Sequence, residues 1–330
     1  MRNYRPINGM KCFCVAIVCS LSLYAEPILL VHDQSGALLR QIRVALRPQG
    51  KVLATRDGLY GAASALLLED QGRVSQVLSI TADDRDSGIV ELFVGLQAPA
   101  GQDLASQFAT TVSMGDHSAK AGEYRSSGGF GPVARLSCSG RGETSGPFYN
   151  EHGFLAGWHA VRNINGQPIV FGIPMERVMT GLTSIPPTGI SQWNGRRNAE
   201  ADEIYTKALA YMWADDYEGA SFYWRKAREA EPNNARTWYH LAFAEGKTGH
   251  SREKTRCFRK AIELKPSFAE AHYDLGIGLA LSGDRDGAMN EVKALKPIDE
   301  SLSRRLEGFL GVVHTDQLPL KKPAVRRSSV

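Results

Sequence analysis

The sequence contains few cysteines. Three of its five cysteines (Cys12, Cys14 and Cys19) stand close to the N-terminus, which leaves Cys138 and Cys257 for the rest of the chain. Two cysteines in a chain of this length do not form a disulfide framework, which small secreted domains need when their core is weak. No Cys/His spacing typical of a metal site occurs. We therefore expect no metal and no other cofactor.

A strong excess of either charge is also missing. The chain has 39 Lys and Arg against 35 Asp and Glu, a net charge of +4. Arg2, Arg5 and Lys11 contribute three of these charges, so the chain without its first 25 residues has a net charge of +1. This balance excludes the basic surface typical of nucleic-acid binding, and it gives no reason to expect attraction to a membrane surface.

The N-terminal segment has the features of a secretory signal. Its basic residues are followed by an apolar run over residues 12–23, which is too short to span a bilayer comfortably. Leu23, Tyr24 and Ala25 then form an acceptable cleavage site. We predict that residues 1–25 are a signal peptide and that the protein is exported to the periplasm or the extracellular space. An uncleaved anchor or a buried helix is the alternative.

Residues 27–183 carry short apolar runs that are separated by turns containing glycine. Each run has the length and composition of a strand: residues 28–31, 38–46, 51–55, 64–68, 74–80 and 88–94. Many short strands at this spacing favour a β-sandwich or a β-barrel. Periodicity alone does not decide between the two.

Four segments of this region resemble the trypsin-like serine proteases, in the same order. Residues 50–62 are similar to the segment that carries the base histidine, and residues 83–92 to the segment that carries the aspartate. Residues 142–157 begin GETSGP and resemble the nucleophile segment, where the family has Gly-Asp/Asn-Ser-Gly-Gly-Pro. Residues 168–178 are similar to the closing strand and helix entry of the bacterial periplasmic members. The resemblance implies an all-β double barrel over residues 27–183.

The resemblance places Asp57 at the base position, Asp86 at the aspartate position and Thr144 at the nucleophile position. The chemistry needs a hydroxyl nucleophile, a neutral imidazole that takes its proton and a buried carboxylate that orients the imidazole. A carboxylate is a far weaker base than an imidazole at neutral pH, so Asp57 cannot replace histidine. If Asp57 lies beside Asp86, the two carboxylates also repel each other. The methyl group of Thr144 crowds the line of attack, and threonine nucleophiles generally use an N-terminal amine.

An alternative nucleophile is Ser145, one position later. It also lacks a base in the expected segment, because the histidines of this region stand elsewhere: His32, His117, His152 and His159. Gly142 matches the glycine whose N–H helps to form the oxyanion hole. Since those donors belong to the backbone, such a pocket can bind a peptide carbonyl or a C-terminal carboxylate without cleaving it. Two hypotheses follow: a catalytically degenerate binding domain, and an active serine endopeptidase that uses Ser145 or Thr144 with a non-standard base.

The composition and the repeat pattern of the sequence change after residue 183. Residues 184–200 are polar and rich in Pro and Gly, which indicates a linker. A 34-residue period follows, with matches such as Tyr205/Tyr239/Tyr273, Pro232/Pro266 and Gly249/Gly283. This is the period of tetratricopeptide (TPR) repeats, which are helix–turn–helix units that stack into a solenoid. We predict three repeats and a capping helix over residues 201–313 and a disordered basic tail over residues 314–330.

TPR solenoids bind partners on a concave face lined by the first helix of each repeat. Here the resemblance places an aromatic and aliphatic set on that face: Tyr205, Leu209, Tyr239, Phe243, Tyr273 and Ile277. Such a surface suits an apolar peptide or a partner helix. Packing of these residues against the barrel or against the capping helix is the alternative. We predict an exported protein-binding scaffold that binds no nucleic acid and, after signal cleavage, no membrane.

Overall fold

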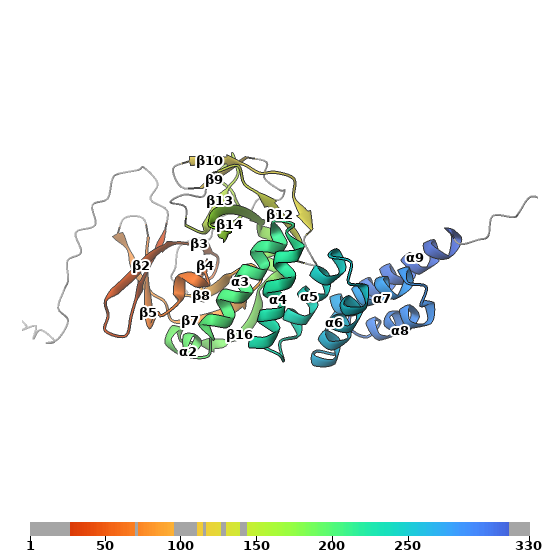
Figure 1. Ribbon diagram of the computed structural model, residues 1–330. Coiled ribbons are helices and arrows are strands. Elements are labelled where there is room, and N and C mark those ends of the chain that lie inside the picture. Colours follow the sequence, from red (N-terminus) through yellow and green to blue (C-terminus); the bar gives the residue numbers. More distant parts are fainter. Residues whose placement is uncertain are drawn as a thin grey trace, which may run out of the picture.

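The computed structural model describes residues 27–69, 72–95, 111–114, 117–126, 130–138 and 144–316. A β-rich part comes first and a helical part follows it, as predicted (Figure 1). The predicted signal peptide, Gly142 and most of the predicted tail lie outside the described residues. No helix among the described residues is both long and apolar enough to cross a bilayer.

The first half of the β-rich part consists of two antiparallel sheets. One has the order β2 (Leu38–Arg43), β1 (Ile28–His32), β5 (Ser64–Leu68), β6 (Val74–Gln76). The other has the order β16 (Thr183–Thr188), β7 (Ser79–Asp84), β8 (Ile89–Phe93), β4 (Lys51–Thr55), β3 (Ala45–Arg47). Their apolar side chains, including Leu29, Val52 and Leu92, form one buried cluster. A short 3₁₀ turn, η1 (Asp57–Leu59), follows β4.

The second half is a seven-stranded antiparallel sheet. Its order is β10 (His117–Lys120), β9 (Thr111–Met114), β13 (Gly146–Tyr149), β14 (Leu155–Ile164), β15 (Gln167–Pro174), β12 (Pro132–Arg135), β11 (Arg125–Ser126). Asn165 and Gly166 connect β14 to β15, and both have positive φ. That pair suits the tight turns whose twist matches a β-hairpin. Helix α1 (Met175–Gly181) follows β15.

The predicted linker is not a linker in the structure. Strand β16 pairs with β7 at the edge of its sheet, where Pro186 and Pro187 are tolerated because an edge strand needs fewer N–H donors. Helix α2 (Ile190–Gly195) then buries Ile190 and Trp193 in the first β cluster. The composition of residues 184–200 is that of a loop, but its apolar residues tie it to the β-rich part.

Seven helices of the described chain form the helical part: α3 (Ala199–Trp213), α4 (Tyr217–Ala230), α5 (Ala235–Lys247), α6 (Ser251–Leu264), α7 (Ala269–Leu281), α8 (Arg285–Leu295) and α9 (Glu300–Asp316). Helices α4, α6 and α8 begin at equal steps of 34 residues. The helices stack one after another, with α9 farthest from the β-rich part (Figure 1). Buried alanines such as Ala220, Ala261 and Ala288 allow their close approach.

The two parts share an apolar core. The ring centre of Trp213, at the end of α3, lies 4.8 Å from the ring centre of Phe130 and 5.5 Å from that of Phe171, both in the β-rich part. Trp213 belongs to a cluster that also contains Ile173 and Met175. The helical part is therefore docked on the β-rich part through buried side chains, and this docking decides which of the predicted site residues are accessible.

Candidate functional site: a cleft and a docked turn

The predicted nucleophile segment lies beside the predicted base residue. Asp57, Thr144 and Ser145 line one cavity of about 380 Å³ between the two halves of the β-rich part. Gly58 and Gly88 line the same cavity. The structure thus brings together residues from three distant segments, in the place where the resemblance expects a catalytic site.

The hydroxyl of Ser145 in this cavity and the nearby imidazole of His159 both contact the backbone. Oγ of Ser145 accepts a hydrogen bond of 3.0 Å from the N–H of Val161. The buried ring of His159 places Nε2 2.7 Å from the carbonyl oxygen of Thr144, which also accepts a bond from Arg43. A nitrogen that donates to a carbonyl carries its proton and cannot accept another. In this arrangement Nε2 of His159 contacts the carbonyl of Thr144, and Nη2 of Arg43 lies 3.1 Å from the same nitrogen.

Asp57 points toward basic residues and solvent. Its side chain is 56% exposed, and its Oδ1 lies 3.9 Å from the guanidinium of Arg197. The two predicted triad carboxylates thus have different partners: Asp57 lies near Arg197, and Asp86 pairs with Arg236.

Asp86 lies in the turn between β7 and β8 and is directed into the helical part. Its Oδ1 accepts a hydrogen bond of 2.5 Å from the Tyr205 hydroxyl and lies 3.3 Å from Nε2 of His240. Its other oxygen forms an ion pair with Arg236 on α5. Burial alone raises the pKa of Asp86, but Arg236, His240 and Tyr205 outweigh burial and hold the pKa well below its ordinary value. The carboxylate is ionised and fully used by the helices.

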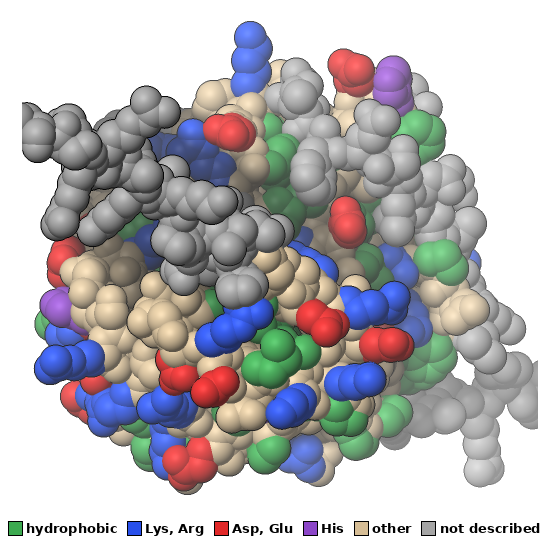
Figure 2. All heavy atoms as spheres, turned by 90° about the vertical axis from the view of Figure 1, so that its right-hand side faces the viewer, with side chains coloured by type: hydrophobic (Ala, Val, Ile, Leu, Met, Phe, Trp, Pro, Cys, Tyr) green, Lys and Arg blue, Asp and Glu red, His purple; other side chains and the backbone are tan. Residues whose placement is uncertain are grey.

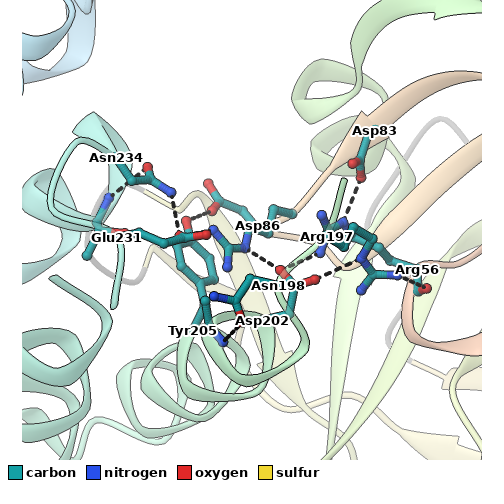
Figure 3. Close-up of polar contacts among 12 residues, drawn as sticks. Arg56, Asp83, Asp86, Arg197, Asn198, Asp202, Tyr205, Glu231 and Asn234 are labelled. Carbon is teal, nitrogen blue, oxygen red and sulfur yellow. Dashed lines mark hydrogen bonds and ion pairs between the residues drawn. The ribbon is translucent and has the colours of Figure 1, made fainter. Parts of the chain in front are cut away.

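A network of ion pairs surrounds this contact (Figure 3). The carboxylate of Asp202, at the start of α3, accepts hydrogen bonds from Arg56 at 2.9 Å and Arg197 at 2.8 Å, and it forms an ion pair of 2.8 Å with Arg85. Arg85 also pairs with Glu231, and its guanidinium lies 4.2 Å from the centre of the Tyr205 ring. The β7–β8 turn is consequently held between α3 and α5 by several charged contacts that are largely removed from water.

The helical face predicted to bind a partner is only partly open. Tyr205 and Leu209 are almost fully buried, because α3 packs on the β-rich part. Tyr239 is also buried, and its hydroxyl donates a hydrogen bond of 2.8 Å to Asp274. The alternative of packing against the β-rich part is thus correct for the first repeat, and Tyr205, Leu209 and Tyr239 are corrected as partner contacts.

Three residues of that face keep accessible surface: Phe243 on α5, and Tyr273 and Ile277 on α7. We call them the open helical face. Arg236 and Glu270, near the starts of the same two helices, line a cavity of about 400 Å³ between α1 and the helices. Figure 2 views the molecule from its α7–α9 end, where Lys and Arg side chains are interspersed with Asp and Glu and with hydrophobic side chains.

Sequence reasoning missed the docking residues Arg56, Arg197, Arg236 and His240. The segment 83–86 reads Asp-Asp-Arg-Asp, which is more charge than a hairpin turn requires. The charged side chains of this segment that the turn does not need could have indicated that they form ion pairs with residues elsewhere in the chain. Within the described part of the chain, no cluster of His, Cys, Asp and Glu could hold a metal ion.

No protein-family model matches the sequence, and no curated protein matches it significantly. Solved structures that are similar to parts of the chain include TPR domains and a serine endoprotease. All three structures named below are under 20% identical to this chain, and each match covers less than half of it.

The TPR2B-domain:pHsp70-complex of yeast Sti1 is 18% identical, covers 36% of this chain and 100% of that chain, and has a TM-score of 0.34. The Yersinia enterocolitica type III secretion chaperone SycD, in complex with a peptide of the translocator YopD, is 12% identical. The match covers 36% of this chain and 96% of that chain, with a TM-score of 0.34. The serine endoprotease from Yersinia pestis is 15% identical, covers 47% and has a TM-score of 0.37. This chain spans about 60% of that endoprotease.

Proposed function

We propose that the protein is an exported scaffold that binds a peptide or protein segment. In this proposal a trypsin-like double barrel that has lost catalysis is joined to a TPR solenoid, which recruits the partner. The observation that carries the proposal is the position of Asp86. The residue expected to orient a catalytic base is bound by Tyr205, Arg236 and His240, so it joins the two parts of the molecule instead.

The chemistry of the cleft supports the absence of catalysis. General-base catalysis needs an acceptor within about 3 Å of the hydroxyl that loses its proton. Among the described residues, the partner of the Ser145 hydroxyl is the N–H of Val161, which is a donor and cannot take up the hydroxyl proton. Asp57 lies 3.9 Å from Arg197 and is 56% exposed, and a carboxylate is in any case a far weaker base than an imidazole at neutral pH.

The open helical face supports the binding role. Phe243, Tyr273 and Ile277 present aromatic and aliphatic surface on two neighbouring helices. Interfaces gain much of their binding free energy from a few such anchors. The cavity of about 400 Å³ lined by Arg236 and Glu270 lies against the same two helices, so a bound segment can extend from apolar contacts into polar ones.

Site-specific photocrosslinking tests the binding role. A photoreactive phenylalanine analogue is placed at Ile277 on the open helical face and, as the matched control, at exposed Lys293 on α8. We expect a discrete crosslinked partner from position 277 that is absent from position 293. The crosslink should weaken when Tyr273 is changed to Ala in the same protein. Identical products from both positions, or none from position 277, would argue against the proposal.

A serine endopeptidase is the second candidate, since Thr144 and Ser145 line a cavity open to a ligand. A fluorophosphonate probe, which labels activated serine and threonine hydroxyls, decides between the candidates. We expect no labelling above that of the Thr144→Ala/Ser145→Ala double variant. Labelling of the wild type that disappears in the double variant would contradict the loss of catalysis and show that Thr144 or Ser145 is an activated nucleophile.

A further inference from the structure

Arg162, near the end of β14, lies at a wall shared by two cavities. One is the cavity of about 380 Å³ that contains Thr144 and Ser145. The other, of about 420 Å³, lies between the β-rich part and α3 and is lined by Tyr60, Arg197 and Lys207 among others. Asp57, Val161 and Arg162 line both. The two cavities therefore border the same guanidinium.

Arg162 differs in its partners from three other buried or half-buried arginines near it. Arg56, Arg177 and Arg197 each have a carboxylate within ion-pair distance. Among the described residues, the hydrogen bond of Arg162 is to the carbonyl of Val161 at 3.2 Å, and its buried Nε has no partner. Burial lowers the pKa of Arg162, while the charge of Asp57 opposes this effect. A buried cation that lacks a close carboxylate is costly, and a bound anion offsets the cost.

The surroundings of Arg162 combine this cation with apolar surface and free space. The indole of Trp213 lies 5.6 Å from the guanidinium. Gly88 contributes no side chain, and a Cβ at that position would stand only 3.1 Å from Nη2 of Arg162. The remaining lining is mixed: the apolar side chains of Ile42, Trp158, Ala160, Val161 and Ala210, the basic ones of Arg40, Arg197 and Lys207, and the acidic ones of Asp57, Asp202 and Glu203.

The acidic groups do not neutralise Arg162 directly. Asp202 is bound by three other arginines. Asp57 lies nearest to Arg197, and Glu203 forms an ion pair with Lys207. Planar guanidinium groups bind carboxylates through two parallel hydrogen bonds, which is the arrangement an unpaired Nε makes available.

We propose that Arg162 binds the carboxylate of an apolar carboxylic acid, of the kind that the C-terminal residue of a peptide provides. The carboxylate pairs with the guanidinium, and the adjacent apolar side chain packs against Ile42 and Val161, which line the cavity and keep accessible surface. This site differs from the backbone oxyanion hole expected from the sequence, because its anchor is a side chain. It also lies on the β-rich part, away from the open helical face, so it goes beyond the proposed function and can fail or succeed separately.

Isothermal titration calorimetry with the full-length mature chain tests the site. The probe is an N-acetylated tetrapeptide that ends in leucine, supplied as the free acid and as the C-terminal amide. We expect the free acid to bind at least tenfold more tightly than the amide, since a charge-assisted bidentate pair contributes on that scale. Equal affinities, or no binding of the free acid, overturn the proposal. Inorganic phosphate is titrated in parallel, and equal or tighter binding of phosphate overturns the assignment to an apolar carboxylate.

Variants of Arg162 establish the anchor. Arg162→Met should abolish the preference for the free acid, and Arg162→Lys should reduce affinity about tenfold because it keeps the charge but loses the planar fork. Arg259→Met, an exposed change on α6, is the matched control and should leave binding unchanged. If Arg162→Met does not fold, Arg162→Lys decides: unchanged affinity for the free acid overturns the proposal, and a loss of about tenfold supports it.

Discussion

The hydroxyl of Tyr205 donates a hydrogen bond of 2.5 Å to the carboxylate of Asp86, 119 positions earlier in the chain. Both side chains are almost fully buried. One residue comes from the face predicted to hold a partner and the other from the segment predicted to hold a catalytic aspartate. Because these two side chains bind each other, neither is available to another molecule, and the turn after β7 lies against α3 and α5.

Replacement of Asp86 by Asn should strongly weaken the docking of the two parts. The variant leaves Arg236 without its counter-charge, and Arg177, which lies 3.8 Å from the same oxygen, loses part of its own. Removing one partner of a fully buried pair costs about 3–5 kcal/mol. Since the Arg236 side chain is 40% exposed, we expect a loss at or below the lower end of this range. Urea denaturation followed by circular dichroism and by tryptophan fluorescence should show this loss of unfolding free energy.

The matched control is Glu123→Gln, which removes the ion pair with Arg125. That pair is largely exposed, with side chains 73% and 67% accessible, so its loss should change the free energy of unfolding by less than about 0.5 kcal/mol. Similar effects of the two variants would contradict a special role for Asp86.

Acid should release the same contact. The pKa of Asp86 is well below its ordinary value, mainly through Arg236 and His240 acting against burial. A carboxylate with a depressed pKa stabilises the fold above the pKa of the unfolded chain, about 4. This stabilisation is lost as pH falls through the lower, folded pKa. The difference in unfolding free energy between wild type and Asp86→Asn should therefore be constant from pH 7 to about pH 5 and shrink below about pH 4. A difference that grows on acidification would contradict this account.

Asp274 should show the opposite dependence. Burial raises its pKa to about 6, although the hydrogen bond from Tyr239 works against the shift. A carboxyl group whose folded pKa is raised destabilises the fold once pH exceeds the unfolded pKa, and the penalty is complete above the folded pKa. Asp274→Asn should thus match the wild type near pH 4 and be more stable by about 1–2 kcal/mol at pH 7.5.

Carbon-13 NMR of the Asp274 carboxyl checks the cause directly, with a titration midpoint expected near 6. Tyr239→Phe is the informative second variant. It removes the donor that favours the ionised form, so the midpoint should move to higher pH. A midpoint that does not move would show that the hydrogen bond is not what restrains the pKa.

Elements with a regular hydrophobic or repeat period could be predicted from the sequence. The strands over residues 51–55 and 64–68 and the 34-residue steps between α4, α6 and α8 agree with the structure. The direction of the Asp86 side chain was not predictable, because Asp86 lies in the turn between β7 and β8, where no strand or helix period fixes the direction of each side chain. Ser87 lines the cleft, whereas its neighbour Asp86 faces the helices.

The burial of Tyr205 and Leu209 was not predictable either. Their spacing places them on one helical face, but the same apolar composition suits a partner, a cap or another part of the same chain. Which surface covers them depends on the charges of the β7–β8 turn and on the arginines Arg56 and Arg197, whose partner Asp202 stands 146 and 5 positions away. Contacts at such separations have no periodic signature.

Restoration of the family's residues at two positions should not restore catalysis. In the double variant Asp57→His/Thr144→Ser, an imidazole and a primary hydroxyl border the same cavity. The third requirement, a carboxylate that orients the imidazole, stays unmet, because Asp86 is held by Arg236 on the other side of the turn. We expect no fluorophosphonate labelling and no hydrolysis of a casein substrate above the level of the wild type.

A triple variant that adds Ser87→Asp to these two changes tests whether an orienting carboxylate is what the site lacks. Ser87 lines the cavity, so a carboxylate introduced there stands on the side of the turn where Asp86 is missing. If the geometry of the cleft alone limits catalysis, labelling should rise in the triple variant and not in the double variant. Labelling of the double variant as strong as that of the triple variant would show that an orienting carboxylate is not what the site lacks. The position of Asp86 would then no longer explain the loss of activity.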